Sequence, residues 1–278
     1  MPEQSLYLAI VAVLVWLVTL AVARVLQRLL IGVAQPRPGH GMAAAGQVLA
    51  TCIISGSLVA EGITGNLHTP ATWLRDATTV GTFALIAVVL QTLAGWLGMK
   101  TLLGKRLSGA YEKGNDAAML AGAGHDVGAA LIVAHSVYGR DFSQLHVSIA
   151  FFALAQLAAL ALGIGFRALT RYDDAEQVVD GNVAAALSYV GVLLAASLLA
   201  GHAVQGDFTG WVPGLRGFVG ALLFGVVLLP VRRWLVERFL LRGVSLDEAV
   251  ARQRDVAAAA VECASYIAVA LLLHLAGV

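Results

Sequence analysis

The chain contains few charged residues: Asp, Glu, Lys and Arg make up 13% of its 278 residues. A soluble domain carries about 25%, so this chain lacks the polar surface that a water-soluble fold needs. Its two cysteines, Cys52 and Cys263, lie in apolar stretches at different depths, which argues against a disulfide and favours two small buried hydrophobes. No phosphate-binding loop, zinc-protease motif or nucleophile elbow is present.

Long apolar runs are what the chain has instead, with 59% hydrophobic residues and a mean hydropathy of +0.82. Eight stretches approach or exceed the ~20 residues that cross a bilayer as a helix. Continuous apolar runs of this length argue against the alternating strands of a barrel. The sequence therefore predicts an all-α integral membrane protein with eight transmembrane helices, near Leu6–Ile31, His40–Gly62, Arg75–Leu103, Asn115–Tyr138, Ser143–Leu169, Asn182–Val204, Pro213–Leu241 and Asp255–Val278.

Cations are distributed unevenly between the two ends of these segments. Fifteen of the 18 Lys and Arg residues lie on the side that is reached after the first, third, fifth and seventh segments, and only Arg75, Arg140 and Arg216 lie on the other side. The positive-inside rule places the fifteen in the cytoplasm and both termini outside. The first segment has no Lys or Arg before it, so we interpret it as a retained helix and not a signal peptide.

A short motif occurs four times, each time before an Ala-rich segment. The four copies are Gly39-His40, Gly114-Asn115, Gly181-Asn182 and Arg254-Asp255. The repeating unit is thus a two-helix hairpin. Matching residues also recur about 140 residues apart, which is half the chain length, as with Arg75 and Arg216. We therefore predict two parallel four-helix repeats, residues 1–138 and 139–278.

The polar residues that open these Ala-rich segments are expected to be helix N-caps. Asn and Asp are favoured there, and the expected caps are Asn115, Asn182 and Asp255. The alternative is that several helix N-termini open together toward an anion.

Polar residues also recur deeper in the Ala-rich segments, seven and eleven positions after each cap. At 100° per residue both positions return to the face of the cap, so each segment should carry a polar stripe that points away from lipid. We expect these stripes to meet around a common axis and to form a polar path, with His125 beside them; the six stripe residues are Gln47, Thr51, Asp126, Tyr189, Glu262 and Tyr266.

Asp126 lies about 16 Å from its cap at 1.5 Å per residue, close to the bilayer midplane. Glu262 is about 10 Å deep. Ionisable groups at such depth are candidates for a functional site, here a carrier of protons or cations. The alternative is a hydrogen-bonded acid that only ties helices together.

Three histidines, His135, His202 and His274, lie 19 or 20 residues beyond their caps, and Glu61 lies 21 beyond His40. If they cluster, they could bind Zn²⁺ or form a proton-access site, because imidazole and carboxylate groups suit both roles. No single helix carries two of these residues at the spacing of metal ligands. We therefore favour the interpretation that the histidines lie at the membrane interface and bind nothing, and we assign no metal.

The stretch Tyr172-Asp-Asp-Ala-Glu-Gln-Val-Val-Asp-Gly-Asn-Val-Ala-Ala-Ala-Leu187 resembles the domain of unknown function 350 family, also called uncharacterised protein family 0719. Tyr111-Glu-Lys-Gly-Asn115 is a shortened form of it, so the resemblance covers two tandem copies, with His40 departing from the expected Asn. The resemblance implies a bacterial inner-membrane protein. Its implied association with envelope stress is indirect, and the family has no assigned activity.

The favoured function is a transporter or an ion- or proton-conducting protein. The alternative is a scaffold that recruits cytoplasmic envelope-stress proteins, and an intramembrane enzyme ranks third because no nucleophile–base pair is identifiable. No cofactor and no nucleic acid are expected. The partners considered are the lipid bilayer, a second copy of the chain and those cytoplasmic proteins.

Overall fold

The computed structural model describes residues 2–31, 41–63, 70–104, 109–111, 113–137, 142–168, 170–206, 208–240 and 245–276. Within these ranges the chain is helical and contains no strand, which confirms the all-α prediction. The elements are α1 Pro2–Ile31, α2 Gly41–Gly62, α3 Pro70–Leu103, α5 Asp116–Ser136, η1 Phe142–Gln144, α6 Leu145–Arg167, α7 Asp174–Val179, α8 Val183–Ala203, α9 Trp211–Leu235, η2 Val236–Leu240, α10 Leu246–Ala251 and α11 Val256–Ala276.

Eight of these helices are long and apolar enough to cross a membrane, as predicted. Their spans agree with the expected segments to within a few residues at most ends. The spans are Ser5–Leu30, Gly41–Gly62, Thr72–Leu103, Asp116–Ser136, Phe142–Phe166, Val183–Ala203, Trp211–Phe239 and Val256–Ala276.

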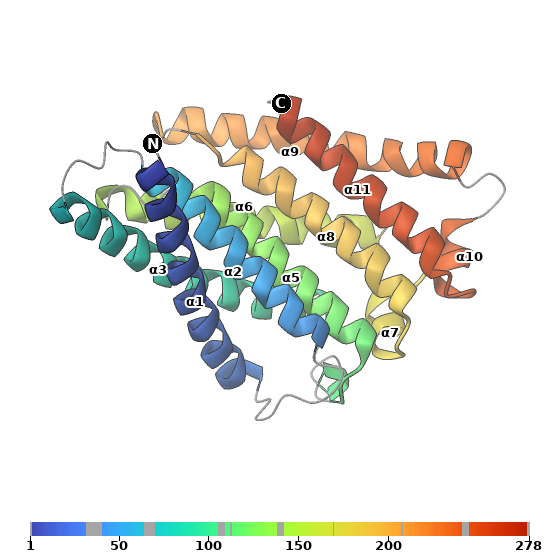
Figure 1. Ribbon diagram of the computed structural model, residues 1–278. Helices are drawn as coiled ribbons and strands as arrows, with labels where there is room; N and C mark the ends of the chain where they lie inside the picture. The colour runs from blue at the N-terminus through green and yellow to red at the C-terminus, as the bar shows by residue number, and fades with distance from the viewer. Residues whose placement is uncertain are drawn as a thin grey trace.

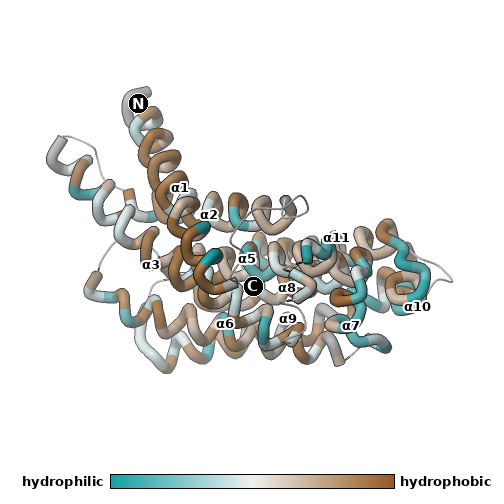
Figure 2. The backbone as a smooth tube through the Cα atoms, turned by 90° about the horizontal axis from the view of Figure 1, so that it is seen from below, coloured by the Kyte–Doolittle hydropathy of each residue, from teal (hydrophilic) through white to brown (hydrophobic). Residues whose placement is uncertain are grey.

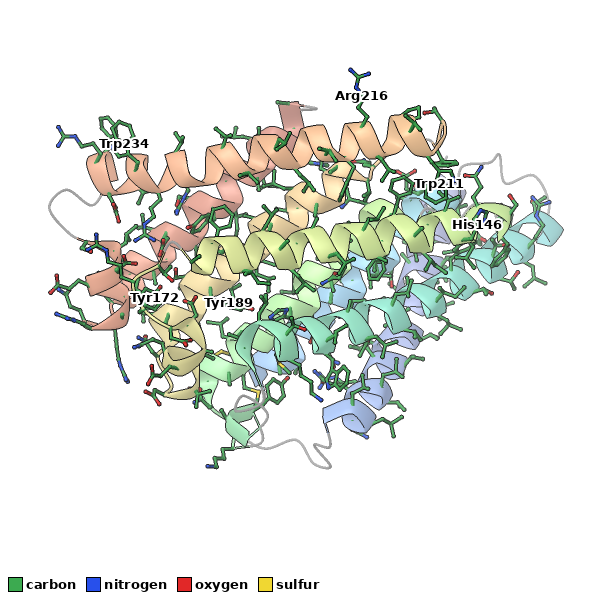
Figure 3. All side chains as sticks on the ribbon, turned by 180° about the vertical axis from the view of Figure 1, so that it is seen from behind. His146, Tyr172, Tyr189, Trp211, Arg216 and Trp234 are labelled. Carbon is green, nitrogen blue, oxygen red and sulfur yellow. The ribbon has the colours of Figure 1, made fainter. Side chains whose placement is uncertain are left out.

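The helices that follow the polar motifs form one row, in the order α2, α5, α8, α11 (Figure 1). Each of α3, α6 and α9 packs against two consecutive members of this row, and they lie in front of it in Figure 3. Helix α1 packs against α2 and α3 at one end of the row. The molecule is therefore an array of four hairpins in which each hairpin repeats the contacts of the one before it.

Small residues bring the helices of the row close together. A Cβ at Gly46 of α2 would lie 2.5 Å from Ala123 Cβ of α5, and one at Gly191 of α8 would lie 2.5 Å from Cys263 Cα of α11. Glycine is therefore required at these crossings, because a side chain would collide with the neighbouring helix. Close approach through small residues is how helices associate in a membrane.

The row is open, which corrects the expectation that its four helices surround a common axis. Helices α2 and α11 lie at opposite ends of the row (Figure 1). The membrane spans of α1, α6, α9 and α11 are 22%, 33%, 14% and 28% buried, against 83% for α8, whereas α3 is half buried, like α2. Apolar colour covers most of α1 in Figure 2, while hydrophilic colour gathers at α7 and α10. Lipid contact explains the exposed apolar faces.

Candidate functional site

The three N-caps that lie in the described part of the chain make capping hydrogen bonds. The Oδ1 of Asn115 accepts from the N–H of Ala118 at 3.1 Å, and that of Asn182 accepts from Ala185 at 3.2 Å. Oδ1 of Asp255 accepts from two N–H groups, those of Ala257 at 2.8 Å and Ala258 at 3.2 Å. His40, the matching residue of the first motif, lies outside the described residues. We call this end of the row the capped end.

Both asparagine caps also hold the next hairpin in place. The amide of Asn115 donates to the carbonyl of Val179, at the end of α7, at 2.9 Å. The amide of Asn182 donates to the carbonyl of Val250, in α10, also at 2.9 Å. Each asparagine thus satisfies a helix N-terminus with its oxygen and fixes the following short helix with its nitrogen. This second role accounts for Asn at both positions, since Asp could supply only the cap.

Asp126 lies inside α5 with 8% of its surface exposed. The Gln91 amide of α3 donates to its backbone carbonyl at 3.1 Å and to its Oδ1 at 3.3 Å. A Cβ at Gly95 would lie 2.9 Å from the same Oδ1, so the absence of a side chain there makes room for the carboxyl group. No lysine or arginine among the described residues lies within ion-pair distance of it.

The Asp126 side chain also lines a small pocket between α1, α3 and α5. The pocket extends to Gln27 of α1 and to Tyr111, which precedes α5 at the capped end. Its free space is about that of a single water molecule. Burial, together with the negative charge of Asp126, raises the pKa of the Tyr111 hydroxyl, which therefore stays protonated and can donate a hydrogen bond. The pocket thus places the carboxyl group and the Tyr111 side chain around the same small space.

His125, the neighbour of Asp126, points toward α8. Its Nε2 lies 2.6 Å from the hydroxyl of Tyr189. A Cβ at Gly98 of α3 would lie 2.9 Å from His125 Nδ1, so a second glycine of α3 makes room for the imidazole. The polar contacts of α5 thus reach α3 on one side and α8 on the other.

Glu262 of α11 lies in a second buried polar cluster with Arg232 of α9, each 3% exposed. Its Oε2 accepts from the Ser188 hydroxyl of α8 at 2.7 Å, and its Oε1 lies 3.6 Å from Arg232 Nη2. The guanidinium also lies 3.2 Å from the ring centroid of Tyr266 and donates to the Glu262 carbonyl at 3.1 Å. The charge of Glu262 is therefore neutralised within the fold.

Tyr172, at the capped end near this cluster, is visible in Figure 3 below α9, at the same end as Trp234. Burial, reinforced by the negative charges of Asp174 and Glu262, raises the pKa of its hydroxyl. Tyr172 therefore stays protonated on the capped side of the Glu262 carboxylate.

The expected polar residues thus lie in separate places along the row, not at one centre. The Gln47 amide donates to the Ala23 carbonyl of α1 at 3.3 Å, and the Thr51 hydroxyl donates to the Gln47 carbonyl of its own helix at 2.8 Å. Asp126 contacts α3, His125 contacts Tyr189, and Glu262 contacts α8 and α9. These groups form a belt across the row, in the half of the helices nearer the capped end.

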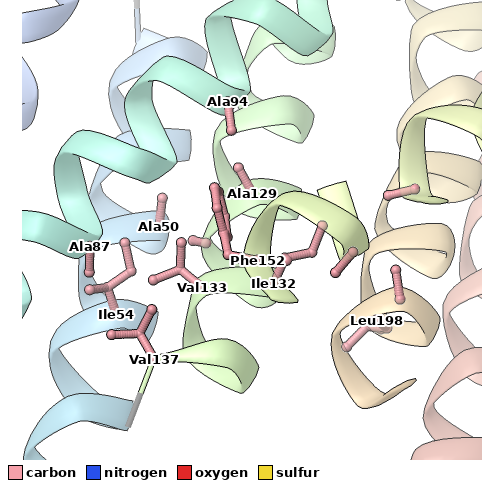
Figure 4. Close-up of a cluster of buried hydrophobic side chains, with 14 of the residues drawn as sticks. Ala50, Ile54, Ala87, Ala94, Ala129, Ile132, Val133, Val137, Phe152 and Leu198 are labelled. Atoms are coloured by element: carbon pink, nitrogen blue, oxygen red, sulfur yellow. The ribbon is translucent and has the colours of Figure 1, made fainter. Parts of the chain in front are cut away.

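The other half of the row is mostly apolar, and the buried polar side chains within it are serines, among them Ser55, Ser136 and Ser197. Beyond Asp126 the interior is filled by Ala129, Ile132 and Val133, which pack with Phe152 and Leu198 of neighbouring helices (Figure 4). Any passage there requires these side chains to move apart.

The three expected histidines do come together at the far end of the row. His202 Nδ1 and His274 Nδ1 are 3.1 Å apart, and the ring centroids of His135 and His274 are 5.2 Å apart. Glu61 lies on α2, on the other side of α5 from α8 and α11. As they stand, no three His, Cys, Asp or Glu side chains of the described residues could hold one metal ion.

Sequence reasoning missed Arg232 and the two glycines of α3. Arg232 was counted with the solvent-exposed cytoplasmic cations, but it is buried seven residues before the end of its span at Phe239. A signal was available, because a cation inside an apolar segment needs a buried partner. Gly95 and Gly98 are recognisable as spacers only once the side chains that face them are known.

The fold and these buried acids define a polytopic, all-helical membrane protein. Residues 141–276 match the family model described as Domain of Unknown Function (DUF350). The chain belongs to this family through its second half, as the resemblance in the sequence indicated. No curated protein and no solved structure matches it.

Proposed function

We propose that the protein moves protons, or a small monovalent cation, across the bacterial inner membrane, with Asp126 as the carrier. One observation carries the proposal: a buried carboxyl group without an ion-pair partner among the described residues lines a small pocket, which Tyr111 near the capped end also lines. Ionisable groups in such positions mark ion and proton pathways. The size of the pocket favours a proton or a small ion over a larger solute.

The two buried acids then have different roles. Glu262 forms an ion pair with Arg232 and accepts a hydrogen bond from Ser188. Its charge therefore stays fixed and has a structural role. The Asp126 carboxyl group accepts a hydrogen bond from the Gln91 amide and has no ion-pair partner among the described residues, so its charge can change without breaking an ion pair there. In this account the first half of the chain, residues 1–138, carries the ion and the second half supplies the rigid partner repeat.

The apolar core beyond Asp126 acts as a closed gate in the same account. Tyr111, which also lines the pocket, lies near the capped end, and the distribution of cations assigns that end to the cytoplasm. Release of the ion to the outside then requires α5 to move relative to α3 and α6. Both termini lie outside in this orientation.

The test is proton flux into proteoliposomes that contain the purified chain, driven by a membrane potential and followed with an internal pH dye. Asp126→Asn should reduce the flux to that of protein-free liposomes, because the amide keeps the size and polarity but cannot cycle a charge. Asp116→Asn is the matched control: Asp116 is an exposed acid in the first turn of the same helix, and its loss should leave the flux unchanged.

Sodium and potassium fluxes measured in the same vesicles identify the ion. The absence of any flux in the folded, correctly inserted wild-type chain would overturn the proposal and favour the scaffold alternative. Equal flux in the wild type and in Asp126→Asn would also overturn the role of Asp126.

A further inference from the structure

Two imidazoles form a hydrogen bond that joins the far ends of α8 and α11. The Nδ1 atoms of His202 and His274 are 3.1 Å apart, and the two rings meet edge to face at 84°. Gln205 fixes the direction of this bond, because its Oε1 lies 3.3 Å from the same His202 Nδ1 and can only accept. His202 Nδ1 therefore carries the hydrogen, and the lone pair of His274 Nδ1 accepts it. We call this pair the histidine contact.

The histidine contact lies far from the tight crossing of the two helices. Helix α8 meets α11 at Gly191 and Cys263, nearer the capped end, where a Cβ on the glycine would collide with the cysteine backbone. Each histidine comes eleven residues after that crossing, which is about 16 Å along its helix. The outer ends of α8 and α11 can therefore separate by a rotation about the crossing that leaves the Glu262 cluster beside it in place.

A third imidazole stands beside the histidine contact. The ring of His135, on α5, lies edge-on to that of His274, with the centroids 5.2 Å apart. Its Nδ1 donates to the Leu131 carbonyl at 2.6 Å, so a further proton adds at Nε2 and leaves that bond intact. Arg216 of α9 and His146 of α6, at the same end, are exposed. Within the described part of the chain, no ion pair neutralises a positive charge on the three imidazoles.

Protonation acts on the histidine contact in two steps. Histidine gains its charge between about pH 8 and pH 5. One proton gained by the pair keeps the bond, because one Nδ1 still donates to the other. A second proton puts hydrogen on both Nδ1 atoms and two like charges in contact, which repel. The separation of 3.1 Å is then no longer a bonding distance.

We propose that the histidine contact is an acid-sensitive switch, which holds the outer ends of α8 and α11 together near neutral pH and releases them when both imidazoles are charged. Protonation of clustered histidines drives other pH-dependent interfaces in the same way. The distribution of cations assigns this end to the outside, so the switch responds to the external pH. The apolar core of the bundle separates it from Asp126.

The test is the distance between spin labels on Val204 and Leu275, at the outer ends of α8 and α11, measured by pulsed electron spin resonance in lipid nanodiscs. Leu275 is 80% exposed, so a label there does not disturb the core. The native Cys52 and Cys263 are first replaced by alanine. The distance should be short near about pH 8 and longer by several ångströms near about pH 5.

His274→Gln should keep the short distance at both pH values, because its Oε1 accepts from His202 Nδ1 and never gains a charge. If that variant does not fold, His202→Gln provides the same test, since its amide donates to His274 Nδ1. His146→Gln is the matched control, an exposed histidine at the same end (Figure 3), and should open as the wild type does. Asp126→Asn should open too, which separates the switch from the ion carrier. A distance in the wild type that does not change with pH, or equal lengthening in the wild type and His274→Gln, would overturn the proposal.

Discussion

The two deeply buried acids differ in what surrounds their charge. Glu262 faces a guanidinium and a serine hydroxyl, whereas Asp126 faces an amide and a pocket. Their depth below the caps was predictable, since it follows from counting residues along a helix. The partners were not predictable, because they come from α3, α8 and α9 and depend on which helices become neighbours.

The Glu262–Arg232 pair gives a residue-scale prediction. Arg232→Met and Glu262→Met should each lower the free energy of unfolding by about 3–5 kcal/mol, because each leaves an uncompensated buried charge. The double variant should lose less than the sum of the two. Thermal unfolding in detergent, followed by circular dichroism, provides the measurement.

Glu237→Gln is the control for this cycle. Its carboxylate lies 3.4 Å from Arg233 Nε and is 38% exposed, so the loss should be about 1 kcal/mol or less. Additive losses in the Arg232/Glu262 cycle would contradict the assignment of a coupled pair.

At the scale of elements, the eight helices and their caps were predictable because both depend on local sequence. Apolar runs set the helix lengths, and Asn or Asp before an Ala-rich segment marks the starts of α5, α8 and α11. The local pattern does not predict the hydrogen bond from each asparagine amide to a backbone carbonyl of the next short helix. That contact joins residues more than 60 positions apart, such as Asn182 and Val250.

The Asn182→Asp variant tests the hydrogen bond to the Val250 carbonyl separately from the helix cap. The carboxylate keeps the acceptor for the Ala185 N–H but places an oxygen against the buried Val250 carbonyl. Loss of the donor should cost about 1–3 kcal/mol, and the added charge should increase that cost. The converse change, Asp255→Asn, keeps its cap and should change stability by only a few tenths of a kcal/mol.

Thermal unfolding of the two variants measures the difference. Equal stability of Asn182→Asp and the wild type would show that the amide of Asn182 does not hold α10 in place.

At the scale of the whole molecule, the repeat was visible in the sequence, but its geometry was not. A fourfold hairpin repeat can close around an axis or continue as an open row, and the choice depends on helix crossings that glycines such as Gly46 and Gly191 permit. In the row, the polar groups contact those of neighbouring helices but do not meet at one centre. We propose that the first half is a diverged copy of the second, which is the half that matches the family.

Orientation in the membrane is the prediction at this scale. Reporter fusions after Lys105, Asp174 and Asp247 should report the cytoplasm, because most cations follow the odd-numbered segments. Fusions after His68, Asp141 and Asp207 should report the outside. A clear reversal at any of the six would contradict the model of eight helices with both termini outside.

The central claim is that the Asp126 carboxyl group binds and releases a proton inside the folded protein. Difference infrared spectroscopy of the lipid-reconstituted chain, recorded between two pH values, measures this directly through the carbonyl stretch of a protonated carboxyl group. We predict a band that shifts in deuterated water, is missing in Asp126→Asn and is retained in Asp116→Asn. A spectrum that is the same in the wild type and in Asp126→Asn would contradict the account.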